Sequence, residues 1–260
     1  MSVQVTILGS GSAGNCALIE TDQTAVLVDA GLSHRQITQR LAVIHRDWAD
    51  VDAILLTHEH SDHTNALAVI SKHTTIPVYA NRLTAEEVTR AASGHISWRL
   101  FANGSTFEIG DFTIEPFSIP HDASDPVGFR LRAPAHTVAF VTDLGHATKL
   151  VIERIRDVDL VVLEANHDVK MLQEDQIRPW ATKQRIMSRH GHLSNDEAAE
   201  VIGEIATAKL QHIVLAHLSR DCNQPELAHR VVDQKLKQIG ATHVRTVVAQ
   251  QQQPTPTLTL

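Results

Sequence analysis

The chain has 260 residues, of which 43% are hydrophobic and 20% are charged, and its formal net charge is −7 at neutral pH. These values are ordinary for a globular protein and exclude a collagen-like chain. The two cysteines, Cys16 and Cys222, are too few for a disulfide-rich scaffold. No apolar run of about 18 residues predicts a membrane span, and the N-terminal residues lack the pattern of a secretory signal. We therefore expect a soluble cytoplasmic protein.

The first third of the chain predicts short strands that are separated by turns. A polar loop, Gly9-Ser-Gly-Ser-Ala-Gly-Asn15, follows the first strand, and Ser33 is a candidate N-cap for the first helix. The apolar run at 53–57 suits a strand that is buried on both faces. The expected strands of this third are 3–8, 16–20, 25–29 and 53–57, and the expected helix is 33–43.

The rest of the chain mixes helices and strands. Ser194 and Glu197 form a capping-box pattern, S-x-x-E, at the start of one helix. The expected helices are 65–72, 84–92, 179–188, 194–208 and 225–239, and the expected strands are 77–80, hairpins within 105–119 and 129–141, 158–163, 213–216 and 243–248. This order predicts one α/β domain over residues 1–250 with a layered sheet core. Residues 251–260, rich in Gln, Pro and Thr, are expected to form a flexible tail.

Histidine is unusually frequent, with 17 residues, and the most informative cluster directly follows the apolar run at 53–57. It contains His58, His60, Asp62 and His63. His58 and His60 lie on one side if the chain stays extended, and Asp62 and His63 then fall at the start of a helix. One short turn can thus present ligands to two metal ions. The alternative is a polar loop with incidental histidines.

Further metal-competent residues follow other expected strands. They are Asp29, His121, Asp143 and His217. Each has a structural explanation when taken alone: Asp29 could cap a turn, and His121 could be a surface residue. Their recurrence after strand ends indicates that these ends converge on one side of a sheet.

The residues His58, His60, Asp62, His63, His121, Asp143 and His217, in this order and with Asp29 as a first motif, resemble the metallo-β-lactamase superfamily. The resemblance covers residues 3 to about 248. It implies the αββα sandwich, in which two mixed sheets face each other between outer helices, with a two-metal site at one edge.

Four further segments are similar to those of the YycJ/WalJ/VicX group: the loop 9–15, Leu163-Glu-Ala-Asn-His-Asp168, Gly191-His-Leu-Ser-Asn195 and His217-Leu-Ser-Arg-Asp-Cys-Asn223. Members of that group are regarded as single-domain metal-dependent phosphodiesterases, described as 5′-to-3′ exonucleases. Cys222 departs from the pattern, since a polar residue is expected there. No separate nucleic-acid clamp domain is visible, which argues against processive action on RNA.

The resemblance also implies a division of the ligands. His58, His60 and His121 would hold one metal ion, Asp62, His63 and His217 the other, and Asp143 would bridge them, while Asp29 would orient a ligand from behind. Ions about 3.5–4 Å apart share a water whose pKa falls toward roughly 7, and the hydroxide can attack phosphorus. Asp62 and Asp143 would therefore be catalytic as well as ligating. A nitrogen and oxygen ligand set suits Zn²⁺ or Mn²⁺, and also Fe²⁺.

The remaining site residues are expected to contact substrate. His192 is a candidate phosphate contact or proton donor, and otherwise a loop residue; His167 is a weaker candidate. Residues 176–192 carry four basic residues and no acid, so a DNA strand could lie there, with Trp180 for stacking; a solvated helix face is the alternative. The expected substrate contacts are Ser12, Asn15, Lys183, Arg185, His192 and Arg220.

These observations favour a metal-dependent phosphodiesterase, specifically a DNA exonuclease. A hydrolase of a small ester, thioester, lactone or cyclic phosphate is the first alternative. A flavin-partnered di-iron oxidoreductase and a regulatory metal-binding partner of a signalling system are further readings. The sequence leaves open the choice between DNA and RNA, the strand polarity, the native metal and the oligomeric state, a homodimer being one option.

Overall fold

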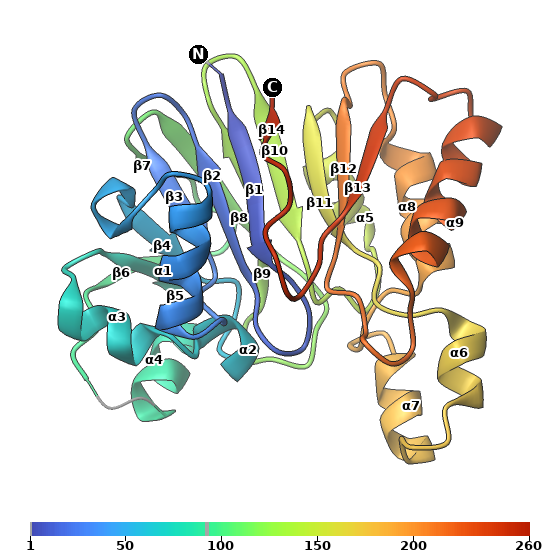
Figure 1. The fold of residues 1–260 in the computed structure, drawn as a ribbon, viewed down its shortest axis with the longest axis horizontal. Helices are drawn as coiled ribbons and strands as arrows, with labels where there is room; N and C mark the ends of the chain where they lie inside the picture. Colours follow the sequence, from blue (N-terminus) through green and yellow to red (C-terminus); the bar gives the residue numbers. More distant parts are fainter. Residues whose placement is uncertain (1, 92–93) are drawn as a thin grey trace.

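Two mixed β-sheets pack face to face in the computed structural model, which describes residues 2–91 and 94–260 (Figure 1). Within these residues the strand orders are β14-β1-β2-β3-β4-β5-β6 and β13-β12-β11-β10-β9-β8-β7. Strands β3 to β6 are parallel to one another, as are β10 to β13, and the other neighbouring pairs are antiparallel.

The bounds of the elements follow the expected ranges closely. The first sheet consists of Gln4–Gly9 (β1), Cys16–Glu20 (β2), Ala25–Val28 (β3), Ala53–Leu55 (β4), Val78–Asn81 (β5), Trp98–Phe101 (β6) and Leu258–Thr259 (β14). The second sheet consists of Phe107–Ile109 (β7), Phe112–Ser118 (β8), Val127–Arg132 (β9), Thr137–Val141 (β10), Leu160–Glu164 (β11), His212–Ala216 (β12) and Arg245–Val248 (β13). The helices are His34–Val43 (α1), Ser61–Thr64 (α2), Leu67–His73 (α3), Arg82–Ala91 (α4), Lys149–Ile155 (α5), Val169–Glu174 (α6), Trp180–Ile186 (α7), Asn195–Ile205 (α8) and Pro225–Gln238 (α9), with a 3₁₀ turn at Trp48–Asp50.

Three apolar layers hold the fold together. Alternation along each strand sends one set of side chains between the sheets, where Val28 and Leu55 share a buried cluster with Phe129 and Phe140. The opposite face of the first sheet packs against α1, α3 and α4. The outer face of the second sheet packs against α5, α8 and α9. The layers are therefore helix, sheet, sheet, helix, which confirms the expected αββα sandwich (Figure 1).

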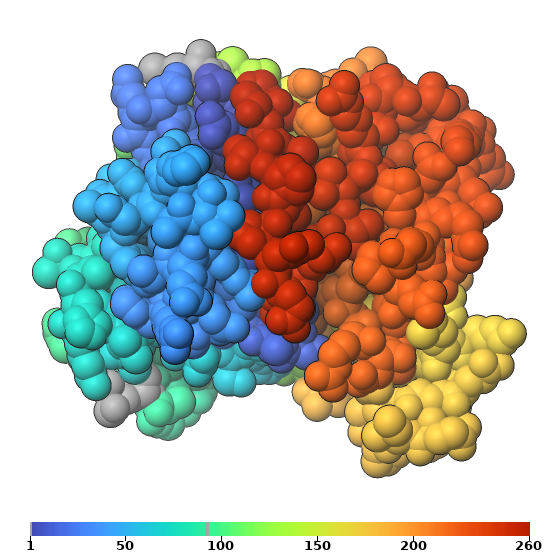
Figure 2. Space-filling view, in the orientation of Figure 1, coloured from blue at the N-terminus to red at the C-terminus, as the bar shows by residue number. Residues whose placement is uncertain are grey.

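The sequence missed strand β6 and helices α5 and α6, and residue 92, the end of an expected helix, lies outside the described residues. The expectation of a flexible tail at 251–260 is wrong. The backbone N–H of Thr255 donates to the carbonyl of Ile7 at 2.9 Å, and β14 then pairs with β1. In Figure 2 this C-terminal segment, in red, lies between the N-terminal half and the orange C-terminal half. In the described ranges, the helices fall short of the length and apolar character that crossing a bilayer requires.

Candidate metal centre

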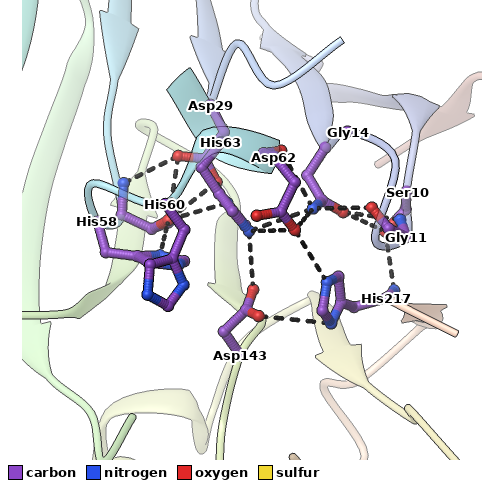
Figure 3. Close-up of polar contacts among 12 residues, drawn as sticks. Ser10, Gly11, Gly14, Asp29, His58, His60, Asp62, His63, Asp143 and His217 are labelled. Atoms are coloured by element: carbon purple, nitrogen blue, oxygen red, sulfur yellow. Dashed lines mark hydrogen bonds and ion pairs between the residues drawn. The ribbon is translucent and has the colours of Figure 1, made fainter. Parts of the chain in front are cut away.

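Ligand-type side chains from both sheets meet at one edge of the sandwich (Figure 3). Parallel strands end at the same edge, so Asp29 after β3 and His58 after β4 are neighbours, as are Asp143 after β10 and His217 after β12. Ligand atoms within 4.8 Å of one another define the groups His58–His60–His121, Asp62–His63–His217 and His58–His63–Asp143. The structure thus brings together all seven residues that the sequence singled out as ligands.

Unusual backbone conformations direct two of these side chains, those of Asp143 and His217, and that of Asp29 behind them. Asp29, Asp143 and His217 have φ angles of 61°, 56° and 56°. Residues other than glycine rarely adopt this left-handed region, because it costs on the order of 1–3 kcal/mol and persists only where the surrounding structure enforces it. Asp29 and His217 directly follow buried strands, and Asp143 lies two residues after the end of β10, so the chain turns at the strand end in each case. The sharp turn aims the side chain along the sheet edge and into the cluster.

Close backbone contact fixes the segment that carries Asp62 and His63. A Cβ atom on Gly31 would collide with the backbone carbonyl of Asp62, so the two segments can approach only because residue 31 is glycine. The N–H of Asn15 donates to the same carbonyl at 2.7 Å, and the N–H of Ala30 donates to the carbonyl of His63 at 2.8 Å. Helix α2 is therefore anchored to the first sheet by its backbone.

Asp29 contacts His63 on the side of the ring that faces away from Asp62 and Asp143. Its Oδ2 lies 2.7 Å from Nδ1 of His63, and its Oδ1 accepts from the backbone N–H of Thr57 at 2.9 Å. Both Asp29 and His63 are fully buried. Because Nδ1 faces a carboxylate, Nε2 is the nitrogen directed at Asp62 and Asp143, at 3.5 Å and 3.1 Å.

Glu164, at the end of β11, is a member of the site that the sequence analysis missed. Its Oε1 lies 2.7 Å from Nδ1 of His217 and 2.9 Å from Nδ1 of His192. Its Oε2 accepts from the backbone N–H groups of Leu144 and Leu193. This fully buried carboxylate therefore orients two imidazoles at once. Its position at a strand end, like that of Asp143, was the signal that could have found it.

The close contacts in the cluster shift the pKa values of its histidines and carboxylates. Burial lowers the pKa of His63, but Asp29 and Asp143 outweigh that effect and raise it well above its usual range. Burial also lowers the pKa of His217. Asp143, Asp62 and Glu164 outweigh that effect and raise the pKa to about 10. Although burial raises the pKa of Asp143, His217 and His63 hold it well below its ordinary value. Asp143 is therefore a carboxylate at neutral pH.

The donor set fits divalent metal ions. Among the described residues, Nε2 of His121, Nε2 of His217 and Oδ2 of Asp143 are buried without a hydrogen-bond partner. Unpaired buried polar atoms are costly, so their convergence at one place calls for a further partner. Imidazole nitrogens and carboxylate oxygens without thiolate suit Zn²⁺ or Mn²⁺.

A cavity of about 270 Å³ opens over this cluster. His60, His121, Asp143 and His217 form its floor, and Ser12, Arg185 and His192, three of the expected substrate contacts, form part of its walls. Arg178 lines it as well. Arg185 is held by an ion pair with Asp122, which raises the pKa of its guanidinium.

Three expected substrate contacts lie elsewhere. Asn15 is buried, and its Nδ2 donates to Oδ2 of Asp62, a candidate ligand, at 3.3 Å. Lys183 is only 6% exposed, because its ammonium donates to the backbone carbonyls of Gln173 and Asp175. The basic segment is therefore not one continuous solvated face. Arg220 lines a neighbouring cavity.

Two other candidates from the sequence, His167 and Trp180, do not line the cavity over the cluster. His167 is buried and forms an isolated bridge with Ser194, so it belongs to the support of the second sheet. Trp180, at the start of α7, is 59% exposed, and α6 and α7 together project below the second sheet (Figure 1).

Comparisons with known proteins identify relatives along most of the chain. The model of the beta-lactamase superfamily domain matches residues 24–218. Exodeoxyribonuclease YycJ of Bacillus anthracis is 36% identical over 92% of this chain and 91% of its own length. Exodeoxyribonuclease WalJ of Streptococcus pneumoniae is 38% identical over 90% of this chain and 88% of its own length.

Solved structures agree on the fold. The metallo-beta-lactamase fold protein YhfI from Bacillus subtilis has a TM-score of 0.74 at 19% identity and covers 98% of this chain and 99% of that one. Zn²⁺-bound PqqB from Methylobacterium extorquens has a TM-score of 0.71 at 18% identity and covers 99% of both chains. The matching domain model, the ordered ligand segments and the αββα layers together show that this chain belongs to the metallo-β-lactamase superfamily, alongside YycJ and WalJ.

Proposed function

We propose that this protein is a metal-dependent phosphodiesterase that shortens DNA from the 5′ end. One observation carries the proposal: two groups of three metal-competent side chains, each drawn from both sheets, both approach Asp143. Oδ2 of Asp143 lies 3.1 Å from Nε2 of His63, and its Oδ1 lies 3.8 Å from Nε2 of His121. Such an arrangement suits a pair of divalent ions, and paired ions are typical of enzymes that cleave phosphate esters. The naming of both similar relatives as exodeoxyribonucleases supports DNA as the substrate.

The contacts among the candidate ligands divide them into one set for each of two ions. His58, His60 and His121 would hold one ion, and Asp62, His63 and His217 the other, with Asp143 shared between them. When bound, zinc or manganese ions would acidify a water and neutralise the charge that builds on the phosphate oxygens. Asp29 and Glu164 contribute by holding the His63 and His217 rings in the orientation that ligation requires.

His192 is the proposed proton donor to the leaving oxygen. Its Nδ1 faces Glu164 at 2.9 Å, so Nε2 is the nitrogen left for substrate. It lines the cavity beside His121 and His217, whose rings lie 5.2 Å from its own. Arg178 and Arg185, on the cavity wall, would attract the phosphate and position it over the ligands.

The experiment uses purified protein with single-stranded DNA labelled at either end, in the presence of Mn²⁺ or Zn²⁺ and in EDTA. We expect release of mononucleotides from the 5′ end with metal and none in EDTA. An Asp143→Ala variant should be inactive while its circular dichroism stays native. Cleavage of a thioester or lactone, with DNA and bis(p-nitrophenyl) phosphate left intact, would overturn the proposal in favour of a small-ester hydrolase.

A matched pair of variants tests the cavity wall. Arg185→Met should raise the KM for DNA, because Arg185 faces the cavity, whereas Arg189→Met, on an exposed site outside it, should not. Equal effects from both would show that general surface charge, rather than the cavity wall, attracts the substrate.

A further inference from the structure

A second cavity adjoins the candidate metal centre. Its volume is about 630 Å³, and Ser12, Arg178 and Ser219 line both it and the first cavity. It lies between the loop after β1, the segment that follows His217 and the chain after β13. This size is in the range of pockets that bind small organic molecules, and its continuity with the first cavity places any occupant next to the reacting phosphate.

Part of the lining of this cavity is apolar. Ala13, Leu218, Pro225 and Ala249 supply aliphatic atoms. Asp221 is the acidic residue among those that line it, and its carboxylate is paired with Arg178 at 2.8 Å and with Arg220 at 3.2 Å. The cavity therefore offers no free negative charge in the described residues, and a neutral planar group next to a phosphate matches it.

The amide side chains around the cavity are largely used within the protein. Gln251 accepts from the N–H of Ala13 at 2.9 Å and donates to the carbonyl of Gly14 at 2.8 Å. Asn223 donates to the carbonyl of Ala165 at 2.8 Å, and its oxygen accepts from the N–H of Gln224. Gln250 accepts from Gln253 at 2.7 Å. A site discriminates bases strongly only when it has polar groups waiting for a partner. The amide oxygens of Gln250, Gln251 and Asn223 are already used within the protein, while the fourth lining amide, Gln252, is exposed.

We propose that this cavity is a nucleoside subsite, which takes the base and sugar of one nucleotide next to the scissile phosphate and does so without reading the base. The proposal rests on the phosphodiesterase function proposed above. Arg178 lines both cavities where the joining phosphate would lie, and its guanidinium is also paired with Asp175 and Asp221; Arg220 lines the second cavity. Contact with the base is through aliphatic atoms, which every base accepts equally.

The test compares substrates that fill one cavity or both. Bis(p-nitrophenyl) phosphate carries no nucleoside, whereas the 5′- and 3′-(p-nitrophenyl phosphate) esters of thymidine do. We expect the wild-type protein to show at least a tenfold higher kcat/KM on one of the thymidine esters. Ala13→Trp, at an exposed position of the second cavity, should remove that advantage and leave bis(p-nitrophenyl) phosphate turnover within twofold. Ala13→Ser should retain it.

A second variant guards against misfolding of the loop. Gln252→Trp fills the cavity from the segment that follows β13, and Gln23→Trp, at an exposed position that lines neither cavity, is its control. The subsite is overturned if no thymidine ester has an advantage, or if the advantage survives both Ala13→Trp and Gln252→Trp, while bis(p-nitrophenyl) phosphate is still cleaved. If the wild-type protein cleaves none of the three esters and no DNA, the proposed function itself fails.

The same subsite predicts little sequence preference. Oligonucleotides that differ only in the nucleotide beside the cleaved bond should be shortened at rates within about threefold of one another. A preference of a hundredfold or more for one base would contradict a subsite in which most of the lining amides are already paired within the protein.

Discussion

Oδ2 of Asp29 lies 2.7 Å from Nδ1 of His63, and both side chains are fully buried. The two residues belong to different segments, one after β3 and the other in α2. Asp29 also accepts from the backbone and the hydroxyl of Thr57. The contact therefore couples the orientation of a proposed ligand to the backbone at the ends of two parallel strands.

Asp29→Asn should weaken metal binding without unfolding the protein. The amide keeps the size of the side chain but loses one acceptor, and such supporting carboxylates are worth about 10- to 100-fold in metal affinity. Competition with a chromophoric chelator measures the change. Asp22→Asn, at an exposed acid, is the control. Unchanged affinity in Asp29→Asn would show that His63 needs no support from Asp29.

His192→Ala should slow DNA cleavage by about 10²- to 10⁴-fold, the usual contribution of a proton donor. It should affect bis(p-nitrophenyl) phosphate much less, because p-nitrophenolate leaves without a proton. Steady-state kinetics on both substrates, with metal content measured in parallel, checks this. His190→Ala, at an exposed neighbour, should change neither rate. A parallel loss on both substrates would assign His192 to phosphate binding.

Gly31→Ala should destabilise the fold by about 1–3 kcal/mol, because the added methyl group collides with the backbone of Asp62 and forces it to move. The displacement should also reduce metal content. Gly203→Ala in α8 is the matched control, since its methyl group meets only the flexible end of Lys235 and alanine favours a helix by about 1 kcal/mol. Urea denaturation measures both; equal stability of the two variants would contradict the close contact.

Lys183→Met should lower stability and leave substrate affinity nearly unchanged. The ammonium satisfies two carbonyls at the turn before α7, and their loss costs roughly 1–3 kcal/mol. Thermal unfolding and the KM for DNA are the two measurements. A large increase in KM with normal stability would return Lys183 to the substrate surface.

Removal of metal should lower the thermal midpoint. Ions bound at about a thousand times their Kd stabilise the folded state by roughly 4 kcal/mol, which in a chain of this size corresponds to roughly 8–16 °C. Scanning calorimetry with Zn²⁺ or Mn²⁺ and with EDTA tests this, and the His60→Ala variant should show a smaller shift. Identical midpoints with and without metal would indicate that the cluster binds no ion tightly.

The sequence predicts the candidate site best where a metal-competent side chain directly follows an apolar strand. His58 to His63 and the residues Asp143 and His217 follow apolar runs, so their convergence could be predicted from strand geometry. The sequence does not predict the role of Glu164, because Glu164 is the last residue of such a run. A single acidic residue at that position is typical of an ordinary strand boundary. Its role depends on two imidazoles from distant segments, which spacing along the chain does not reveal.

Other errors have equally physical causes. The sequence predicts Lys183 as part of a basic face. The carbonyls that accept from its ammonium lie about ten residues earlier in the chain, and no local sequence pattern indicates their position. The polar segment 251–260 has no apolar alternation, yet its backbone completes the edge of the first sheet beside β1. Helix α6 is short, and its N-cap, Asp168, was recognised only as part of a longer motif.

The two sheets each contribute a separate portion of the candidate metal centre. His58, His60, Asp62 and His63 are carried by the first sheet, and His121, Asp143 and His217 by the second. The spacing between these portions is set by the thickness of the apolar layer around Phe129 and Phe140. A smaller side chain in that layer would let the two sheets approach each other, and this would shorten the distance between the two portions. Substitutions far from the candidate metal centre would therefore change which ionic radius fits it.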